Sequence, residues 1–173
     1  VGSEAIRINS GFLGERDFMP NSVDVSQEVL DRIVGSYSEL AEEAEFTGVR
    51  LLIENHGGPS ADPTNIGYFL EGVGSDWFRA CPDFGNFLPG DVYRGLDIML
   101  PHAYAVHAKL YNVDSSEQVI DRRGRKREFD LAKCIDMVKA SGYDDVICLE
   151  WEGPEPDERE AIGGGLELIR SVL

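Results

Sequence analysis

Short apolar runs that alternate with segments of helical periodicity constrain the fold of this chain more than any other feature. Their apolar residues are continuous, which is typical of parallel strands covered on both faces. A regular alternation of strand and helix predicts an α/β domain built on a parallel sheet. The five predicted strands are residues 5–8, 49–54, 77–84, 104–109 and 146–150.

The segments between the runs have the spacing and the end signals of helices. The first helix is predicted to start at Ser22 or Asp24 and to end at Thr47, before Gly48. Further helices are expected from Asp62, from Asp91 to Leu100, from 129 to 140 and from 157 to 173, the last with a weak point at 163–165. The apolar positions of the first helix recur at steps of three and four, at Val25, Val29, Ile33, Tyr37, Leu40 and Ala44.

An open doubly wound sheet and a TIM barrel both fit this pattern. The phosphate-binding glycine fingerprints GxGxxG and GxxxxGK[ST], which mark many open sheets, do not occur in the sequence. Their absence favours a barrel. Because a complete barrel needs about 250 residues and this chain has 173, we expect one partial (β/α)₈ barrel domain over residues 1–173 with about five βα units.

Polar residues stand at the ends of four predicted strands: Glu54, Asp83, His107 and Glu150. The carboxyl ends of parallel strands meet at one edge of a sheet, where α/β proteins bind ligands. Three oxygen ligands and one imidazole, with no thiolate, suit Mn²⁺ or Mg²⁺ better than Zn²⁺. The four residues therefore predict a divalent-metal site that also carries acid/base groups.

Each of these residues also has a simpler structural interpretation. Glu54 alone could be a loop residue or a helix cap, and Asp83 stands in a segment with turn chemistry. A lone histidine in an apolar strand, such as His107, is more often a hydrogen-bonded core residue than a ligand. Glu152 is a rival to Glu150, since residues two apart in a strand point the same way. Only the set of four favours the metal site.

Four segments together resemble the second half of the xylose isomerase-like TIM barrels: 53–56 (IENH), 82–86 (PDFGN), 106–109 (VHAK) and 149–153 (LEWEG). The resemblance implies that Glu54, Asp83, His107 and Glu150 bind one ion, and that Glu54 and Glu150 exchange a proton with a bound keto-sugar. The first strand is similar to the fourth strand of that family. The resemblance therefore implies that three N-terminal βα units are missing and that the chain is the C-terminal portion of a barrel.

The function predicted on this basis is a metal-dependent sugar or sugar-phosphate isomerase or epimerase. His56, Lys109 and Asn86 are the expected substrate contacts, although the keto-sugar epimerases have a histidine where Asn86 stands. One alternative is a keto-sugar or inosose-type dehydratase or lyase, and a second is a non-catalytic metal- or sugar-binding fragment. An endonuclease is least favoured, because that branch of the family uses more histidines than the three of this chain.

The composition limits the partners and the compartment. A net charge of −16 disfavours nucleic acid and acidic membrane surfaces, and no apolar run is long enough to span a membrane. We expect a cytoplasmic protein with Cys81, Cys134 and Cys148 buried, a possible homo-oligomer, and, as a hypothesis, a halophilic source. The basic segment 122–127 is expected to be a solvated loop tip or a site that attracts anionic sugars.

Overall fold

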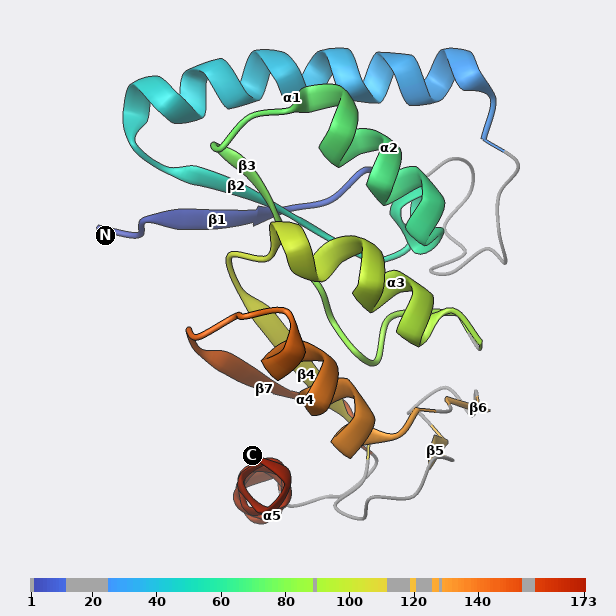
Figure 1. Ribbon diagram of the computed structural model, residues 1–173, viewed down its shortest axis with the longest axis vertical. Coiled ribbons are helices and arrows are strands. Elements are labelled where there is room, and N and C mark those ends of the chain that lie inside the picture. The colour runs from blue at the N-terminus through green and yellow to red at the C-terminus, as the bar shows by residue number, and fades with distance from the viewer. Residues whose placement is uncertain are drawn as a thin grey trace.

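The computed structural model of the protein describes residues 2–11, 25–88, 90–111, 119–120, 126–127, 129–153 and 158–173. Across these residues each major helix follows a strand, as the sequence predicts (Figure 1). The parallel strands are β1 (Ala5–Ile8), β2 (Arg50–Glu54), β3 (Phe78–Cys81), β4 (Val106–Leu110) and β7 (Ile147–Trp151). The α-helices are α1 (Gln27–Thr47), α2 (Pro63–Val73), α3 (Val92–Met99), α4 (Leu131–Ala140) and α5 (Glu158–Val172).

The parallel strands form one continuous row. Strands β1, β2 and β3 pair in that order, and β4 pairs with β7. Isolated parallel bridges, Ala80 with Ala103 and Asp83 with His107, join the two groups, and the His107 amide donates to the Pro82 carbonyl at 2.9 Å. The row therefore runs β1-β2-β3-β4-β7 within the described residues, and the predicted partial barrel is confirmed.

Shorter elements fill the connections between these strands and helices. A 3₁₀ turn, η1 (Gly58–Ala61), precedes α2, and a second, η2 (Leu100–His102), follows α3. In the long connection after β4, the short strands β5 (Val119–Ile120) and β6 (Lys126–Arg127) pair antiparallel, where the sequence predicted only a polar loop. Most of the basic segment 122–127 lies outside the described residues, which include only the backbone of β6.

The helix ends follow the signals in the sequence. Gly48 ends α1 in the left-handed conformation with φ 71°, which glycine adopts without steric cost. The Asp62 carboxylate accepts from the Thr64 amide at 2.8 Å and caps α2, whose first residue is Pro63. The Asp130 carboxylate caps α4 in the same way, which the sequence analysis did not predict.

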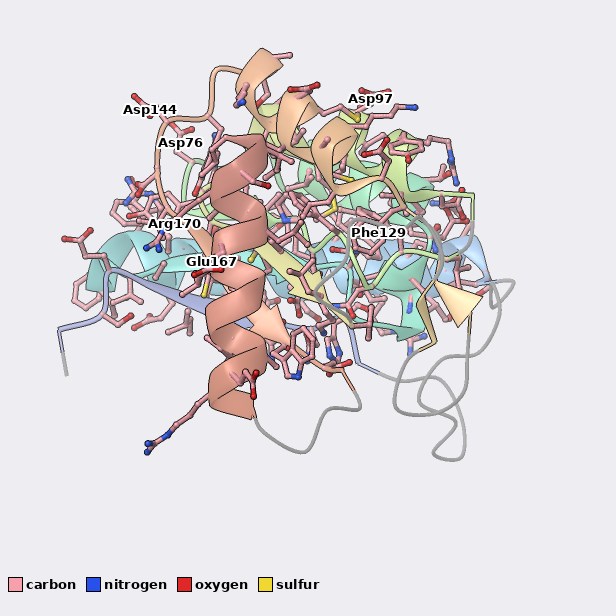
Figure 2. The ribbon with its side chains drawn as sticks, turned by 90° about the horizontal axis from the view of Figure 1, so that it is seen from below. Asp76, Asp97, Phe129, Asp144, Glu167 and Arg170 are labelled. Atoms are coloured by element: carbon pink, nitrogen blue, oxygen red, sulfur yellow. The ribbon has the colours of Figure 1, made fainter. Side chains whose placement is uncertain are left out.

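The apolar core lies between the strand row and the helices. Strand residues that face the helices, such as Ile53, Ala80 and Ala108, are fully buried there with Ile66 of α2 and Ile135 of α4. Figure 2 shows α5, which carries Glu167 and Arg170, lying in front of the strands near this core. No helix among the described residues has the length and apolar character that a membrane span requires.

The structure corrects two expectations about burial. Leu40 is 48% exposed, because the buried stripe of α1 passes through Tyr37 and Ala41 and leaves Leu40 at its edge. Cys81 and Cys134 are buried, but Cys148 is exposed. Cys148 stands opposite His107 in the β4–β7 pair and so lies on the face of the row turned away from the helices, which β7 leaves open to solvent.

Glycines allow close packing at two points of the core. A Cβ atom on Gly95 of α3 would lie 2.1 Å from Cε1 of the buried Phe87 ring. A Cβ atom on Gly165 of α5 would lie 3.1 Å from Cδ2 of Leu149. The glycine run of α5, a predicted weak point, is helical and brings this helix close to β7.

We predict that Gly95→Ala lowers the free energy of unfolding by about 1–3 kcal/mol, because the new methyl group overpacks the core against Phe87. The matched control is Gly163→Ala in α5, where a Cβ atom would meet nothing within 4 Å. There the higher helix propensity of alanine should raise stability by up to about 1 kcal/mol. Urea denaturation measures both values. Equal stabilities of the two variants would contradict the packing described for α3.

Candidate metal centre

The inner face of the strand row, defined as the face turned away from the helices, carries the polar chemistry. Side chains alternate between the two faces of a strand. Register places Arg7, Leu52 and Arg79 on one side, while Ile53 and Ala80 belong to the core. The reactive residues that share the inner face with Arg7 are Glu54, Cys81, Asp83, His107, Lys109, Cys148 and Glu150.

The structure brings the four predicted metal ligands together. Glu54 ends β2, Asp83 follows β3, His107 lies in β4 and Glu150 in β7. One ligand atom from each residue lies within 4.8 Å of those of the other three. Glu54 and Asp83 are fully buried, whereas His107 and Glu150 are partly accessible to solvent. The cluster is therefore compact and open on one side.

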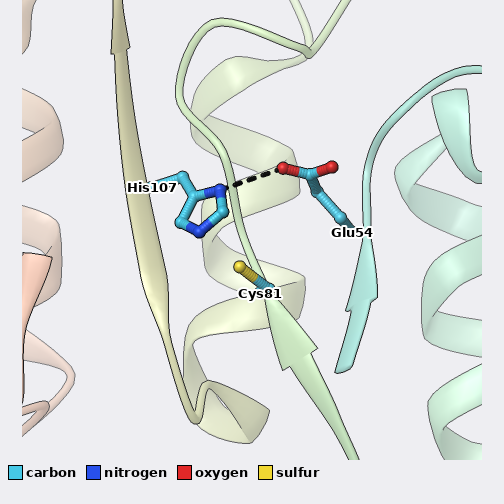
Figure 3. A group of neighbouring side chains, drawn as sticks. All are labelled: Glu54, Cys81 and His107. Atoms are coloured by element: carbon cyan, nitrogen blue, oxygen red, sulfur yellow. Dashed lines mark hydrogen bonds and ion pairs between the residues drawn. The ribbon is translucent and has the colours of Figure 1, made fainter. Parts of the chain in front are cut away.

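The imidazole of His107 lies between the two glutamates. Its Nδ1 atom is 3.1 Å from Oε1 of Glu54 and 3.6 Å from Oε2 of Glu150. The dashed line in Figure 3 marks the contact with Glu54. Contacts with the Cys81 sulfur and with the carboxylates of Glu150 and Glu54 raise the pKa of His107 to about 12. The ring therefore carries a proton at neutral pH in this structure.

A network of hydrogen bonds fixes Asp83. The Asn55 side chain accepts from the Asp83 amide at 2.8 Å and donates to the Asp83 carbonyl at 2.9 Å, which extends the β2–β3 pairing beyond the strand ends. The Asp83 carboxylate accepts from the Gly85 amide at 2.9 Å and from the Asn86 side chain at 2.8 Å. These bonds fix the orientation of a carboxylate that has no contact with solvent.

Lys109 is buried beside the cluster. Its Nζ atom lies 3.0 Å from Oδ1 of Asn86, 3.3 Å from Asp83 and 3.2 Å from Glu150. Burial alone would lower the pKa of Lys109, but the carboxylates of Asp83 and Glu150 raise it above its ordinary value. Lys109 is therefore a fully buried, charged lysine and not an ordinary surface residue. Gly85 makes room for this side chain, because a Cβ atom there would lie 2.9 Å from Cβ of Lys109.

The electrostatics of the cluster suit a divalent cation. Burial, together with the charges of Glu54 and Glu150, raises the pKa of Asp83 to about 7 against the lowering effects of Lys109 and of the Gly85 amide. Oε2 of Glu150 is buried and accepts no hydrogen bond from the described residues. A cation that binds here would stabilise these carboxylates and give this oxygen, which accepts no hydrogen bond, a ligand role.

Glu150 and Glu152, the two candidates from β7 and the residues after it, lie at different places relative to the cluster. Glu150 is one of the clustered ligands, whereas Glu152 is not and lies 3.6 Å from the Nζ atom of Lys109. The nearby His107, with help from Lys109, lowers the pKa of Glu150 to about 2 despite partial burial. Glu150 is therefore ionised at neutral pH.

The predicted substrate contacts have different positions. The His56 amide donates to the Glu54 carbonyl at 2.9 Å in a sharp turn, and its half-buried side chain is not one of the four clustered residues. Asn86 and Lys109 are buried and contact Asp83. Contact of any of these residues with a sugar stays a prediction.

Sequence reasoning missed two residues of the cluster. Arg7 of β1 makes an ion pair with Glu54, and the only signal was a charge between Ile6 and Ile8 of an apolar strand. Cys81 forms a second group with Glu54 and His107 in which the ligand atoms also lie within 4.8 Å of one another (Figure 3). Its signal was its position two residues before Asp83.

Comparison with known proteins identifies relatives of the whole chain. A family model described as a xylose isomerase-like TIM barrel matches residues 4–172. No protein of curated function matches the sequence significantly.

Solved structures similar to the chain include a xylose isomerase-like TIM barrel protein from Mycobacterium smegmatis in complex with magnesium, with a TM-score of 0.65 and 15% identity over 99% of this chain and 61% of that chain. The 3-keto-D-glucoside 4-epimerase from E. coli has a TM-score of 0.70 and 16% identity, over 99% of this chain and 65% of that chain. A D-tagatose 3-epimerase-like protein has a TM-score of 0.64 and 18% identity, over 98% of this chain and 64% of that chain. The chain thus spans less than two thirds of the length of these proteins.

We predict that the cluster binds Mn²⁺ or Mg²⁺ more tightly as the pH rises from 6 to 8. His107, with a pKa of about 12, and Asp83, with a pKa of about 7, hold protons that the ion must displace. The apparent affinity should rise by up to about tenfold per pH unit for each proton released. Calorimetric titration in two buffers with different ionisation enthalpies measures the release.

The control for this titration is His102→Asn, because His102 lies in η2 and in neither group of clustered ligands. This variant should keep the pH dependence of the wild type. An affinity that stays constant between pH 6 and 8 would contradict the protonated state described for His107.

Proposed function

Because the chain belongs to the xylose isomerase-like TIM barrel family, we propose that it carries the metal centre of a sugar isomerase or epimerase. The observation that supports this most is the convergence of Glu54, Asp83, His107 and Glu150 on the inner face. The proposed ion is Mn²⁺ or Mg²⁺, and the proposed substrates are keto-sugars, free or phosphorylated. Sugar epimerases among the similar structures agree with this class.

The four clustered residues would hold the ion, and each suits this role for a reason of its own. Asp83 is fixed by donors on both oxygens and retains lone pairs for coordination. Glu54 and Glu150 each present an oxygen to the Nδ1 atom of His107. When bound, a divalent ion would supply positive charge to the carbonyl and hydroxyl oxygens of the sugar and so acidify the neighbouring C–H bond.

Glu54 and Glu150 are the proposed proton-transfer groups. They come from β2 and β7, on opposite sides of β3 and β4, so they approach a ligand on the inner face from two sides. Glu150 is ionised and partly open to solvent, and both properties suit a base that removes a proton from a bound substrate. One glutamate would remove the proton beside the carbonyl, and the other would return a proton to the opposite face of the carbon.

The residues proposed to orient the sugar are His56, Asn86 and Lys109. His56 is the first choice, because its half-buried ring follows Glu54 directly at the carboxyl end of β2. Asn86 and Lys109 already contact Asp83 and each other. We propose that these two side chains supply hydrogen-bond donors to the sugar from their positions beside Asp83.

The experiment is proton exchange in D₂O, measured by NMR with a panel of keto-sugars and Mn²⁺ or Mg²⁺. Glu54→Gln and Glu150→Gln should each slow deuterium incorporation by at least about 100-fold, since a positioned general acid or base contributes that much. Glu167→Gln on the outer helix α5 is the control and should exchange at the wild-type rate. Wild-type rates in both site variants would refute the two-carboxylate mechanism.

The same samples separate the alternative functions. A product of unchanged mass supports an isomerase or epimerase, whereas loss of water supports the dehydratase alternative. Metal binding without exchange on any keto-sugar would support a binding protein instead of an enzyme.

A further inference from the structure

The two glutamates of the cluster are held in the same manner, although they come from strands at different positions in the row. Each has one oxygen directed at the Nδ1 atom of His107: Oε1 of Glu54 at 3.1 Å and Oε2 of Glu150 at 3.6 Å. The other oxygen of each is taken by a cation of the protein. The Nη1 atom of Arg7 lies 2.5 Å from Oε2 of Glu54, and the Nζ atom of Lys109 lies 3.2 Å from Oε1 of Glu150.

We propose that Arg7 and Lys109 are positioning residues that make each glutamate present a single oxygen to the ion, and that they thereby select Mg²⁺ or Mn²⁺ over Ca²⁺. The inference rests on the proposed metal centre. In this proposal Arg7 positions Glu54, and Lys109 positions Asp83 and Glu150, in addition to any contact that Lys109 makes with substrate.

Burial makes these contacts persistent. The side chains of Glu54 and Lys109 are fully buried. If either side chain moved away, its partner would be left as a charge without its ion pair, which is costly in a buried site. Lys109 is also held by Asn86 at 3.0 Å, which fixes the ammonium group from a third direction. Arg7 is 41% exposed on β1 and can be replaced without opening the core.

The selectivity follows from the coordination that each ion requires. Mg²⁺ is small and needs near-octahedral geometry, in which carboxylates usually contribute one oxygen each. Ca²⁺ takes six to eight oxygens at longer distances and readily uses both oxygens of a carboxylate. A glutamate whose second oxygen is bound by Arg7 or Lys109 cannot rotate to offer both. The protein cations therefore penalise Ca²⁺ more than Mg²⁺.

The test is the ratio of the dissociation constants for Ca²⁺ and Mg²⁺, measured by calorimetric titration without sugar. In Arg7→Met the ratio should fall by about tenfold, the scale of one hydrogen bond to a charged group. Lys109→Met should change the ratio in the same direction. Loss of a positive charge alone would strengthen the binding of both ions, and a general loss of order in the site would weaken the binding of both. Neither effect would change the ratio of the dissociation constants.

Arg79→Met is the matched control, because Arg79 lies in β3 and makes its ion pair with Asp76 instead of a ligand. Its ratio should equal that of the wild type. If Lys109→Met does not fold, Arg7→Met decides the question. An unchanged ratio in Arg7→Met overturns the inference, as does a wild type that binds neither ion. Since no sugar is present, failure of the proposed catalysis leaves this result intact.

Discussion

Carboxylates removed from water stay ionised only where cations or hydrogen-bond donors replace the lost hydration. The cluster of this protein depends on that requirement, since Glu54 and Asp83 are fully buried and Glu150 is close to both. Lys109 lies among them without any solvent contact and serves Asp83 and Glu150 at once. The absence of a side chain at Gly85 leaves room for the Lys109 side chain.

The division of the strand row into two faces separates folding from chemistry. One face packs small and branched residues such as Ile53 and Ala108 against the helices. The other gathers charge, with Arg7 at one end of the row and Glu150 at the other. Because side chains alternate between the two faces, the apolar core can stabilise the chain without covering the cluster.

The sequence alone predicted the strands, the helix order and the clustering of Glu54, Asp83, His107 and Glu150. This worked because polar residues at the ends of apolar strands are conspicuous, and parallel strands bring those ends together. The partners of the ligands were less predictable. Arg7 and Glu54 are 47 residues apart, and their contact depends on the β1–β2 register, which no local pattern encodes. Cys148 was misjudged because composition does not tell the open face of a strand from its covered face.

The register between β4 and β7 links the two faces in one further way. His107 lies opposite Cys148 and Lys109 opposite Glu150, while Val106 and Ala108 fill the helix side. A slip of one residue would bury an imidazole and an ammonium group among apolar side chains and would turn alanine toward the ligands. Packing against the helices therefore disfavours a shifted register of β4 and β7. The same packing keeps His107, Lys109 and Glu150 together on the inner face.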